Sequence, residues 1–113
     1  MGRFDDVYNA WHADPQTFWA RAAEDVVWTK RWDTLLDDSN PPFYRWFVGG
    51  ETNTCYNAVD RHVDEGRGTQ PAIIYDSPVT GTVETITYDQ LKERVAGFAG
   101  ALAAQGVGYG GRV

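Results

Sequence analysis

A strand–loop–strand–helix tract in the C-terminal part of the sequence places the tightest constraint on the fold. Residues 72–75 and 83–87 are rich in β-branched and aromatic side chains and predict two antiparallel strands separated by a short loop. Thr87 and Gln90 have the spacing of a capping box, in which each side chain accepts a hydrogen bond from the backbone amide of the other residue. The sequence therefore predicts a β-hairpin that leads directly into a helix over about residues 88–105.

This predicted helix carries two different faces. One face has an apolar stripe at helical spacing, made of Leu91, Val95, Phe98 and Leu102. Another carries Gly97 and Gly100, each of which costs a helix about 1 kcal/mol relative to Ala. That cost is understandable if a second backbone approaches closely there. We therefore expect the helix to contact neighbours on two sides.

Two further helices are predicted in the N-terminal half. Pro15 follows a capping Asp14, and the apolar residues after it recur at helical spacing, which predicts a helix over residues 15–26. Asn53 can cap a second helix that stops at Gly66. In that helix, Tyr56, Val59 and Val63 are expected to line one side, with Asp60, Arg61 and Asp64 turned outward.

The segment between these helices, residues 27–50, lacks periodicity. Pro41 and Pro42 exclude a helix because proline has no amide donor and restricts the preceding residue. The segment is expected to be an extended arm, and it carries Trp28, Trp32, Phe43, Trp46 and Phe47. The predicted fold class is α+β: one small domain, residues 1–113, of about three helices and a β-hairpin with a long aromatic-rich arm.

Composition narrows the class of partner. Aromatic residues make up 14% of the sequence, with five Trp, which predicts either a compact aromatic core or a docking surface. The net charge of -6 argues against nucleic acid and anionic membranes, since both require cationic surface. The sequence has no apolar run of the ~20 residues that a membrane span requires, and its start lacks the pattern of a signal peptide. A single cysteine, Cys55, suits the cytoplasm.

Several residue combinations resemble functional motifs, yet each has a simpler interpretation. Gly106, Gly108 and Gly111 match the dinucleotide-binding pattern, but a helix precedes them where a strand is required, so they predict a helix C-cap and a turn. No glycine-rich phosphate loop of the Walker type occurs. The candidate metal ligands, His12, His62 and Cys55, are not paired as a zinc site requires. The candidate nucleophiles are Ser39, Ser77 and Cys55, and no general base can be assigned beside any of them.

Two pairs of adjacent acids, Asp5-Asp6 and Asp37-Asp38, are interpreted as solvated surface. A working carboxylate pair needs one desolvated member with a raised pKa. The sequence therefore predicts no catalytic, cofactor-binding or metal-binding residue.

The order of several segments resembles the N-terminal signature of propionyl-CoA synthetases, within the acetyl-CoA synthetase group of adenylate-forming ligases. The resemblance covers essentially the whole chain. The segments that carry it are Ser39-Asn-Pro-Pro-Phe-Tyr-Arg-Trp-Phe47, Asn53-Thr-Cys-Tyr-Asn-Ala-Val-Asp-Arg-His62, Pro71-Ala-Ile-Ile-Tyr-Asp-Ser-Pro78, Ile86-Thr-Tyr-Asp-Gln-Leu91 and Gly110-Gly-Arg-Val113. In that family the last segment begins the first strand of the large AMP-binding domain.

The resemblance implies an activity for the parent enzyme. Enzymes of this family convert a short carboxylic acid, Mg-ATP and CoA to acyl-CoA, AMP and pyrophosphate through an acyl-adenylate. In them the phosphate loop, the acyl pocket, the CoA-binding arginines and the catalytic lysine all lie downstream of the position of Val113. ATP, Mg and CoA are thus implied for the parent, and this chain alone is expected to be inactive.

The resemblance also implies an interface. In the family the arm wraps the large domain and the helix after it packs against that domain, which marks Phe43, Trp46, Phe47, Asn57, Asp60 and Arg61 as interface residues. Two alternatives stay open for these residues: Asp60 and Arg61 can form a solvated face, and the aromatic side chains can close the chain's own core. The expected partner is the large catalytic domain or a second copy of the chain. Alternative functions are a free-standing interaction or oligomerisation module and, less favoured, a small-molecule binding domain.

Overall fold

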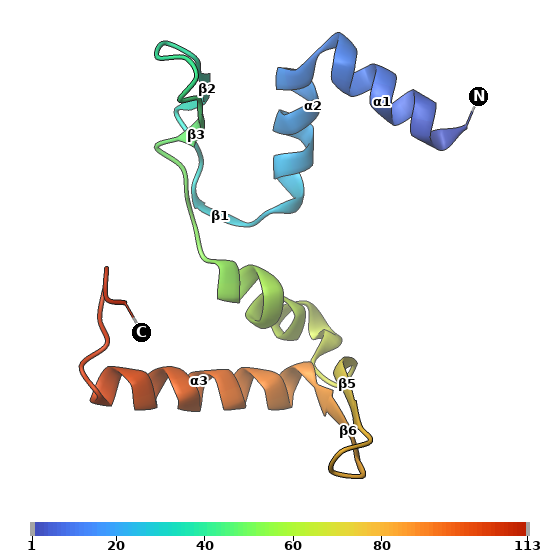
Figure 1. Cartoon of the computed structure of the whole chain (residues 1–113), viewed down its shortest axis with the longest axis vertical. Coiled ribbons are helices and arrows are strands. Elements are labelled where there is room, and N and C mark those ends of the chain that lie inside the picture. Colours follow the sequence, from blue (N-terminus) through green and yellow to red (C-terminus); the bar gives the residue numbers. More distant parts are fainter. Residues whose placement is uncertain (1, 113) are drawn as a thin grey trace. The chain divides into compact units, whose positions relative to one another are not determined.

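The computed structural model describes residues 2–112 and divides into two compact units, Met1–Thr54 and Cys55–Val113. Within the described residues, four helices, a 3-10 turn and three small antiparallel strand pairs give an α+β fold, as the sequence predicts (Figure 1). None of the described helices is long and apolar enough to cross a bilayer. Each unit is described below on its own.

The first unit begins with two helices, α1 (Arg3–Ala13) and α2 (Pro15–Ala22), and a 3-10 turn, η1 (Ala23–Asp25). Helix α2 starts where the sequence predicts, because the Asp14 side chain accepts a hydrogen bond from the Thr17 amide at 3.0 Å. Pro15 occupies the first helical position, where its missing N–H is no loss. Helix α1 is an addition to the predicted elements.

The aromatic segment of the first unit folds back on itself in short strands. Strand β1 (Trp28–Lys30) pairs with β4 (Glu51–Thr52), and β2 (Thr34–Asp37) pairs with β3 (Arg45–Val48). Both pairs are antiparallel. The segment expected as an extended arm is therefore a narrow ladder of paired strands.

The second unit begins with a helix that contains two π-helical stretches, η2 (Tyr56–Asp60) and η3 (Val63–Arg67). Gly66 has the expected left-handed conformation, with a φ of 81°, but the helical turn continues to Arg67, so Gly66 forms a kink and not the predicted stop. The π-helical hydrogen bonding, from residue i to i+5, was not anticipated.

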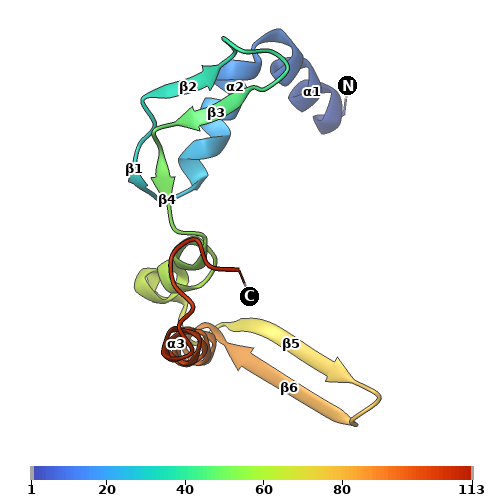
Figure 2. The same ribbon diagram turned by 60° about the vertical axis from the view of Figure 1, so that its left-hand side comes forward.

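The hairpin and the long helix follow as predicted, as β5 (Pro71–Ser77), β6 (Thr82–Thr87) and α3 (Tyr88–Ala104). The capping box is confirmed: the Gln90 amide donates to Thr87 Oγ1 at 3.3 Å and the Thr87 amide donates to Gln90 Oε1 at 2.9 Å. Two backbone bonds, from Tyr88 N to Gln70 O and from Asp89 N to Gly68 O, tie this corner to the preceding turn. The hairpin extends away from the start of α3 (Figure 2).

The end of α3 is a Schellman motif. Gly106 has a φ of 85°, its amide donates to the Ala103 carbonyl at 3.0 Å, and the Val107 amide donates to the Leu102 carbonyl at 3.1 Å. The glycine pattern that mimics a dinucleotide fingerprint is thus a helix C-cap followed by a turn, as expected. Residues 110–112 form no strand, and Val113, which ends that segment, lies outside the described residues.

The described residues bury very little apolar surface. Among them, the buried hydrophobic side chains are Ala23, Val59 and Ile86. The accessible surface of the 12.6 kDa chain is 8902 Å². Two separate compact proteins, each of half the mass of this chain, would together expose about 7,500 Å². Neither unit therefore closes a core of ordinary size around its own aromatic side chains.

Candidate docking surface

Phe47 is the centre of an aromatic cluster in the first unit. Its ring centroid lies 5.0 Å from that of Trp32, 5.4 Å from Trp28 and 6.0 Å from Trp46. Trp28 and Trp32 are themselves 5.0 Å apart in an edge-to-face arrangement. We call Trp28, Trp32, Trp46 and Phe47 the aromatic cluster.

The backbone of Phe47 has an unusual conformation. Its φ is 53°, the left-handed region, which costs a residue with a Cβ about 1–2 kcal/mol. The turn that follows holds it there, since the Gly50 amide donates to the Phe47 carbonyl at 3.0 Å. This backbone conformation directs the Phe47 ring into its contacts with Trp28, Trp32 and Trp46, and those contacts offset the local strain.

The aromatic cluster borders two apolar hollows that share Trp19 and Phe47. One measures about 300 Å³ and is completed by Trp46. The other, about 340 Å³, is completed by Ala22, Ala23, Val26, Trp28 and Thr52. We call the two hollows together the aromatic cleft. Its walls can accept large apolar side chains, because the ring faces that line it are not fully covered.

Within the cluster, Trp28 and Trp46 have different surroundings. Trp28 Nε1 donates to the Ala23 carbonyl at 2.8 Å, and a Cβ at position 50 would lie 2.8 Å from the Trp28 ring, so Gly50 is required for this close approach. Trp46 is 40% exposed. Trp28 therefore fixes the base of the cluster, and Trp46 presents its ring at the surface.

The structure brings together two of the three interface residues predicted in this unit. Trp46 and Phe47 are neighbours on β3 and line one hollow. Phe43 lies outside it, in the loop between β2 and β3, with 73% of its surface exposed. Trp19, which the sequence did not mark as an interface residue, lines the aromatic cleft from α2.

The other three predicted interface residues, Asn57, Asp60 and Arg61, are half-buried on the first helix of the second unit. The prediction that Asp60 turns outward is wrong. Its side chain faces α3, where its carboxylate lies 3.5 Å from Lys92 Nζ. Asp64 lies at the same distance from Lys92, so one ammonium group bridges two carboxylates of the neighbouring helix. This ion-pair network joins the two helices of the unit.

The charges in this network shift two pKa values. Burial lowers the pKa of Lys92, but the carboxylates of Asp64 and Asp60 outweigh it, so the net shift is upward. The hydrogen bond to the Asp64 carboxylate raises the pKa of Tyr56. The two carboxylates therefore favour the charged form of Lys92 and the protonated form of Tyr56.

The second unit also leaves apolar surface open. Ile73, Ile74 and Tyr75 on β5 are 40%, 73% and 44% exposed, and Phe98 on α3 is 67% exposed. Nothing in the described chain lies within 4 Å of a Cβ built at Gly97 or Gly100. The described residues therefore do not supply the close backbone neighbour that these glycines predict. If such a neighbour exists, it belongs to a partner.

The residues considered for chemistry do not converge on a site. The described residues contain no group of three or more His, Cys, Asp or Glu that could hold a metal. Ser39 Oγ donates to Asp37 Oδ1 at 2.6 Å, and the Ser39 hydrogen bonds lower the pKa of Asp37. A catalytic acid requires the opposite shift. His62 packs on Tyr88 with 4.6 Å between ring centroids, and Cys55 is exposed.

Comparison with known proteins defines the class of the chain. Residues 4–58 match the family model described as the acetyl-coenzyme A synthetase N-terminus. The chain therefore matches the N-terminal part of members of the acyl-CoA synthetase family.

Individual relatives cover nearly all of the chain. It is 47% identical over 112 residues to the mitochondrial acyl-CoA synthetase short-chain family member 3 of Rattus norvegicus, with 99% of this chain and 16% of that protein covered. It is 48% identical over 101 residues to an acetyl-coenzyme A synthetase of Burkholderia lata, with 88% of this chain and 15% of that protein covered. The chain thus spans about a sixth of the length of these relatives.

Proposed function

We propose that this chain is the structural and docking part of a short-chain acyl-CoA synthetase, and that its aromatic cleft receives apolar side chains of the large catalytic domain. The exposed aromatic surface supports the proposal most strongly. An apolar surface of this extent is costly in water, and aromatic residues are enriched where protein surfaces meet. The match to the N-terminal region of much longer relatives supports the large catalytic domain as the partner.

The proposed parent enzyme converts acid, ATP and CoA to acyl-CoA, AMP and pyrophosphate. Propionate is the proposed acid, because residues 39–47 resemble the signature of propionyl-CoA synthetases. Mg-ATP and CoA would bind the large domain, and no phosphate-binding glycine loop occurs in this sequence. A cytoplasmic location is also part of the proposal, since one cysteine suits a reducing compartment.

Propionate-dependent ATP–pyrophosphate exchange tests the catalytic part of the proposal. The purified 113-residue chain should show no exchange above a vector control, and a full-length synthetase that carries this N-terminal sequence should exchange faster with propionate than with acetate. Exchange by the chain alone would contradict the assignment of a docking role. A preference for acetate would contradict the proposed substrate and leave the docking role standing.

The docking part is tested by adding the chain to the separately produced large domain. Trp46→Asp should weaken binding at least tenfold, because it places a charge against an apolar surface. Trp46→Phe keeps the apolar ring and should bind nearly as well. Val79→Asp is the matched control, since Val79 is 94% exposed at the hairpin turn and belongs to the other unit. Equal affinity of all variants would rule out the cleft as the docking site.

Self-association is the second candidate function, favoured by the same exposed apolar surface. A second copy could cover the aromatic cleft as a two-fold dimer. Sedimentation at tens of micromolar distinguishes the candidates. A dimer that Trp46→Asp dissociates would favour an oligomerisation module, and a monomer without dye-accessible apolar surface would exclude both.

A further inference from the structure

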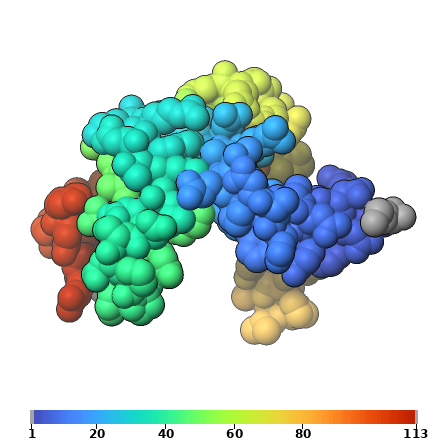
Figure 3. All heavy atoms as spheres, turned by 90° about the horizontal axis from the view of Figure 1, so that it is seen from above, coloured from blue at the N-terminus to red at the C-terminus, as the bar shows by residue number. Residues whose placement is uncertain are grey.

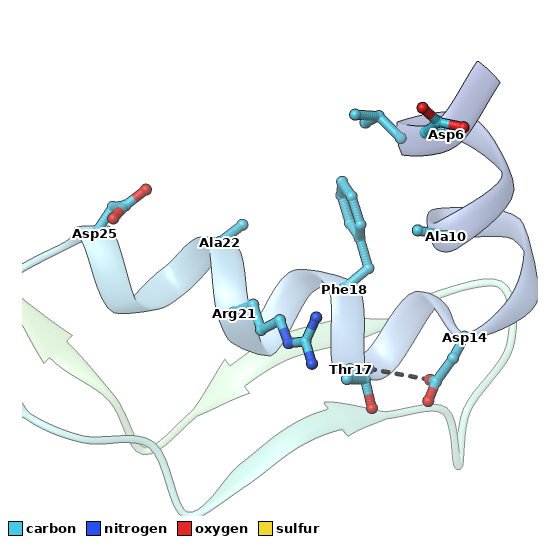
Figure 4. A pocket seen from close by; sticks show the side chains of 9 residues that line it. Asp6, Ala10, Asp14, Thr17, Phe18, Arg21, Ala22 and Asp25 are labelled. Atoms are coloured by element: carbon cyan, nitrogen blue, oxygen red, sulfur yellow. Dashed lines mark hydrogen bonds between the residues drawn. The ribbon is translucent and has the colours of Figure 1, made fainter. Parts of the chain in front are cut away.

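A further hollow, on the first two helices, shares only Ala22 with the aromatic cleft. Helices α1 and α2 enclose about 530 Å³, with an apolar floor of Val7, Ala10, Phe18 and Ala22. The ring of Phe18 points into the space between the two helices (Figure 4). We call this hollow the α1–α2 groove. It lies within one unit and involves neither Trp46 nor Phe47.

The rim of the α1–α2 groove is acidic. Asp6, Asp14 and Asp25 line it together with one cation, Arg21. Hydrogen bonds from Thr17 lower the pKa of Asp14, so this carboxylate stays charged. The rim therefore carries an excess of negative charge around an apolar floor.

An aromatic surface continues from this groove. Val7 and Phe18 also line a neighbouring hollow of about 230 Å³, completed by Phe4, Tyr8, Trp11 and Trp19. The rings of Phe4 and Tyr8 stack at 6.1 Å, and those of Tyr8 and Trp11 lie 5.8 Å apart. Every described residue of α1 is exposed (Figure 3, blue). The helix thus presents a long apolar strip beside an acidic rim.

We propose that the α1–α2 groove binds a basic amphipathic helix of a protein partner. Its apolar side chains would lie against Val7 and Phe18 and along the aromatic strip of α1. Its lysines or arginines would face Asp6 and Asp25. This occupant follows from charge complementarity, since an amphipathic helix docks in an apolar groove through its own apolar stripe.

The charge of the chain makes a second copy a poorer occupant. Each copy carries a net charge of -6, so self-docking would bring like charges together at this rim. The proposed surface shares Ala22 and Trp19 with the aromatic cleft, but its acidic rim and the side chains of α1 lie outside that cleft. The two can therefore fail independently.

The probe is a synthetic helical peptide of about five turns with leucines on one face and lysines elsewhere, matched by the same peptide with glutamates in place of the lysines. Amide shifts of the labelled 113-residue chain should change at residues 6–25 with the lysine peptide. The glutamate peptide should leave them unchanged. Raising the salt concentration should weaken the binding, because rim charges are screened.

Two variants and two control variants locate the binding. Asp6→Asn should reduce the affinity about two- to fivefold, and Asp38→Asn, the same change in the loop after β2, should leave it unchanged. Phe18→Ala should reduce it further, with circular dichroism to check that the helices persist. Trp46→Asp should have no effect here, which separates this test from that of the aromatic cleft.

Three results would overturn the proposal. The first is equal binding of both peptides, and the second is a shift pattern centred on Trp46 and Phe47. The third is a dimer of the chain that Asp6→Asn dissociates and the lysine peptide does not. A second copy of the chain would then cover the groove.

Discussion

The corner between β6 and α3 and the aromatic segment of residues 27–52 are organised in opposite ways. At the corner, the decisive hydrogen bonds join residues three apart, Thr87 and Gln90. In the aromatic segment, the pairing joins Leu36 to Trp46 and Trp28 to Thr52. The first arrangement is local and is specified by a short motif. The second needs chain closure before any contact forms.

The two regions also differ in what stabilises them. The corner satisfies its backbone groups through its own caps, so it is complete without a partner. The aromatic segment depends on ring packing around Phe47, and that packing leaves a cleft. The locally encoded region therefore closes its own hydrogen bonds, whereas the aromatic region leaves an open cleft that, under the proposed function, docking would cover.

Removing the central ring should have the largest effect. Phe47→Ala should lower the free energy of unfolding of the first unit by about 2–3 kcal/mol, below the full value for a buried Phe because Phe47 is half-buried. Phe47→Gly should recover about 1 kcal/mol of that loss, since glycine adopts the φ of 53° without strain. Urea unfolding followed by Trp fluorescence measures both, and a Gly variant no more stable than the Ala variant would contradict the strained backbone.

A tight approach in the second unit should give the next largest effect. A Cβ at Gly68 would clash with the Asp89 carboxylate at the start of α3. Gly68→Ala should therefore cost about 1–2 kcal/mol. Asp89→Ala in the same chain should remove most of this cost. Additive effects in thermal unfolding would mean that the two residues do not meet.

Loss of the cap should be smaller. Thr87→Ala removes the acceptor of the Gln90 amide and should cost about 1 kcal/mol, with a fall of several degrees in Tm. Thr87→Ser keeps the oxygen and serves as the control. A melting curve of the Ala variant that matches the wild type would show that another group satisfies this amide.

The smallest effect is expected from an exposed ion pair. Arg94 lies 2.5 Å from Glu84 and lowers the pKa of that carboxyl from its ordinary value of 4.5. Because the folded pKa is depressed, the contribution to stability is present above pH 4.5 and is lost as the pH falls through the folded value. Arg94→Gln should thus be less stable than the wild type near neutral pH and equal to it in acid. A stability gap that persists in acid would contradict this origin.

The sequence predicts the elements that begin and end with local signals. The helix predicted to stop at Gly66 is kinked there and continues to Arg67, but the hairpin, α3 with its capping box and the start of α2 at Asp14 are confirmed. Each depends on residues within a few positions of one another, so a short window of sequence contains the information. The aromatic composition predicts either a compact core or a docking surface, and the structure shows that the aromatic side chains do not close a core of ordinary size.

The remainder could not be predicted for physical reasons. Helix α1 begins after Gly2, which has no side chain to cap it, so the usual start signal is missing. The π-helical turn of η2 changes the angle between successive side chains, and Asp60 therefore points to α3 where ordinary helical spacing turns it outward. The strand pairs of the aromatic segment depend on distant partners, which periodicity does not reveal.

Hydrogen exchange of the chain alone and within a full-length synthetase that carries it tests the central claim most directly. The account predicts that amides of β3 around Trp46 and Phe47 exchange at least tenfold more slowly in the full-length protein, because docking closes the aromatic cleft. Amides at the corner, including Tyr88 and Asp89, are already bonded in the chain and should change less. Equal exchange of β3 in both contexts would contradict the docking of the aromatic cleft.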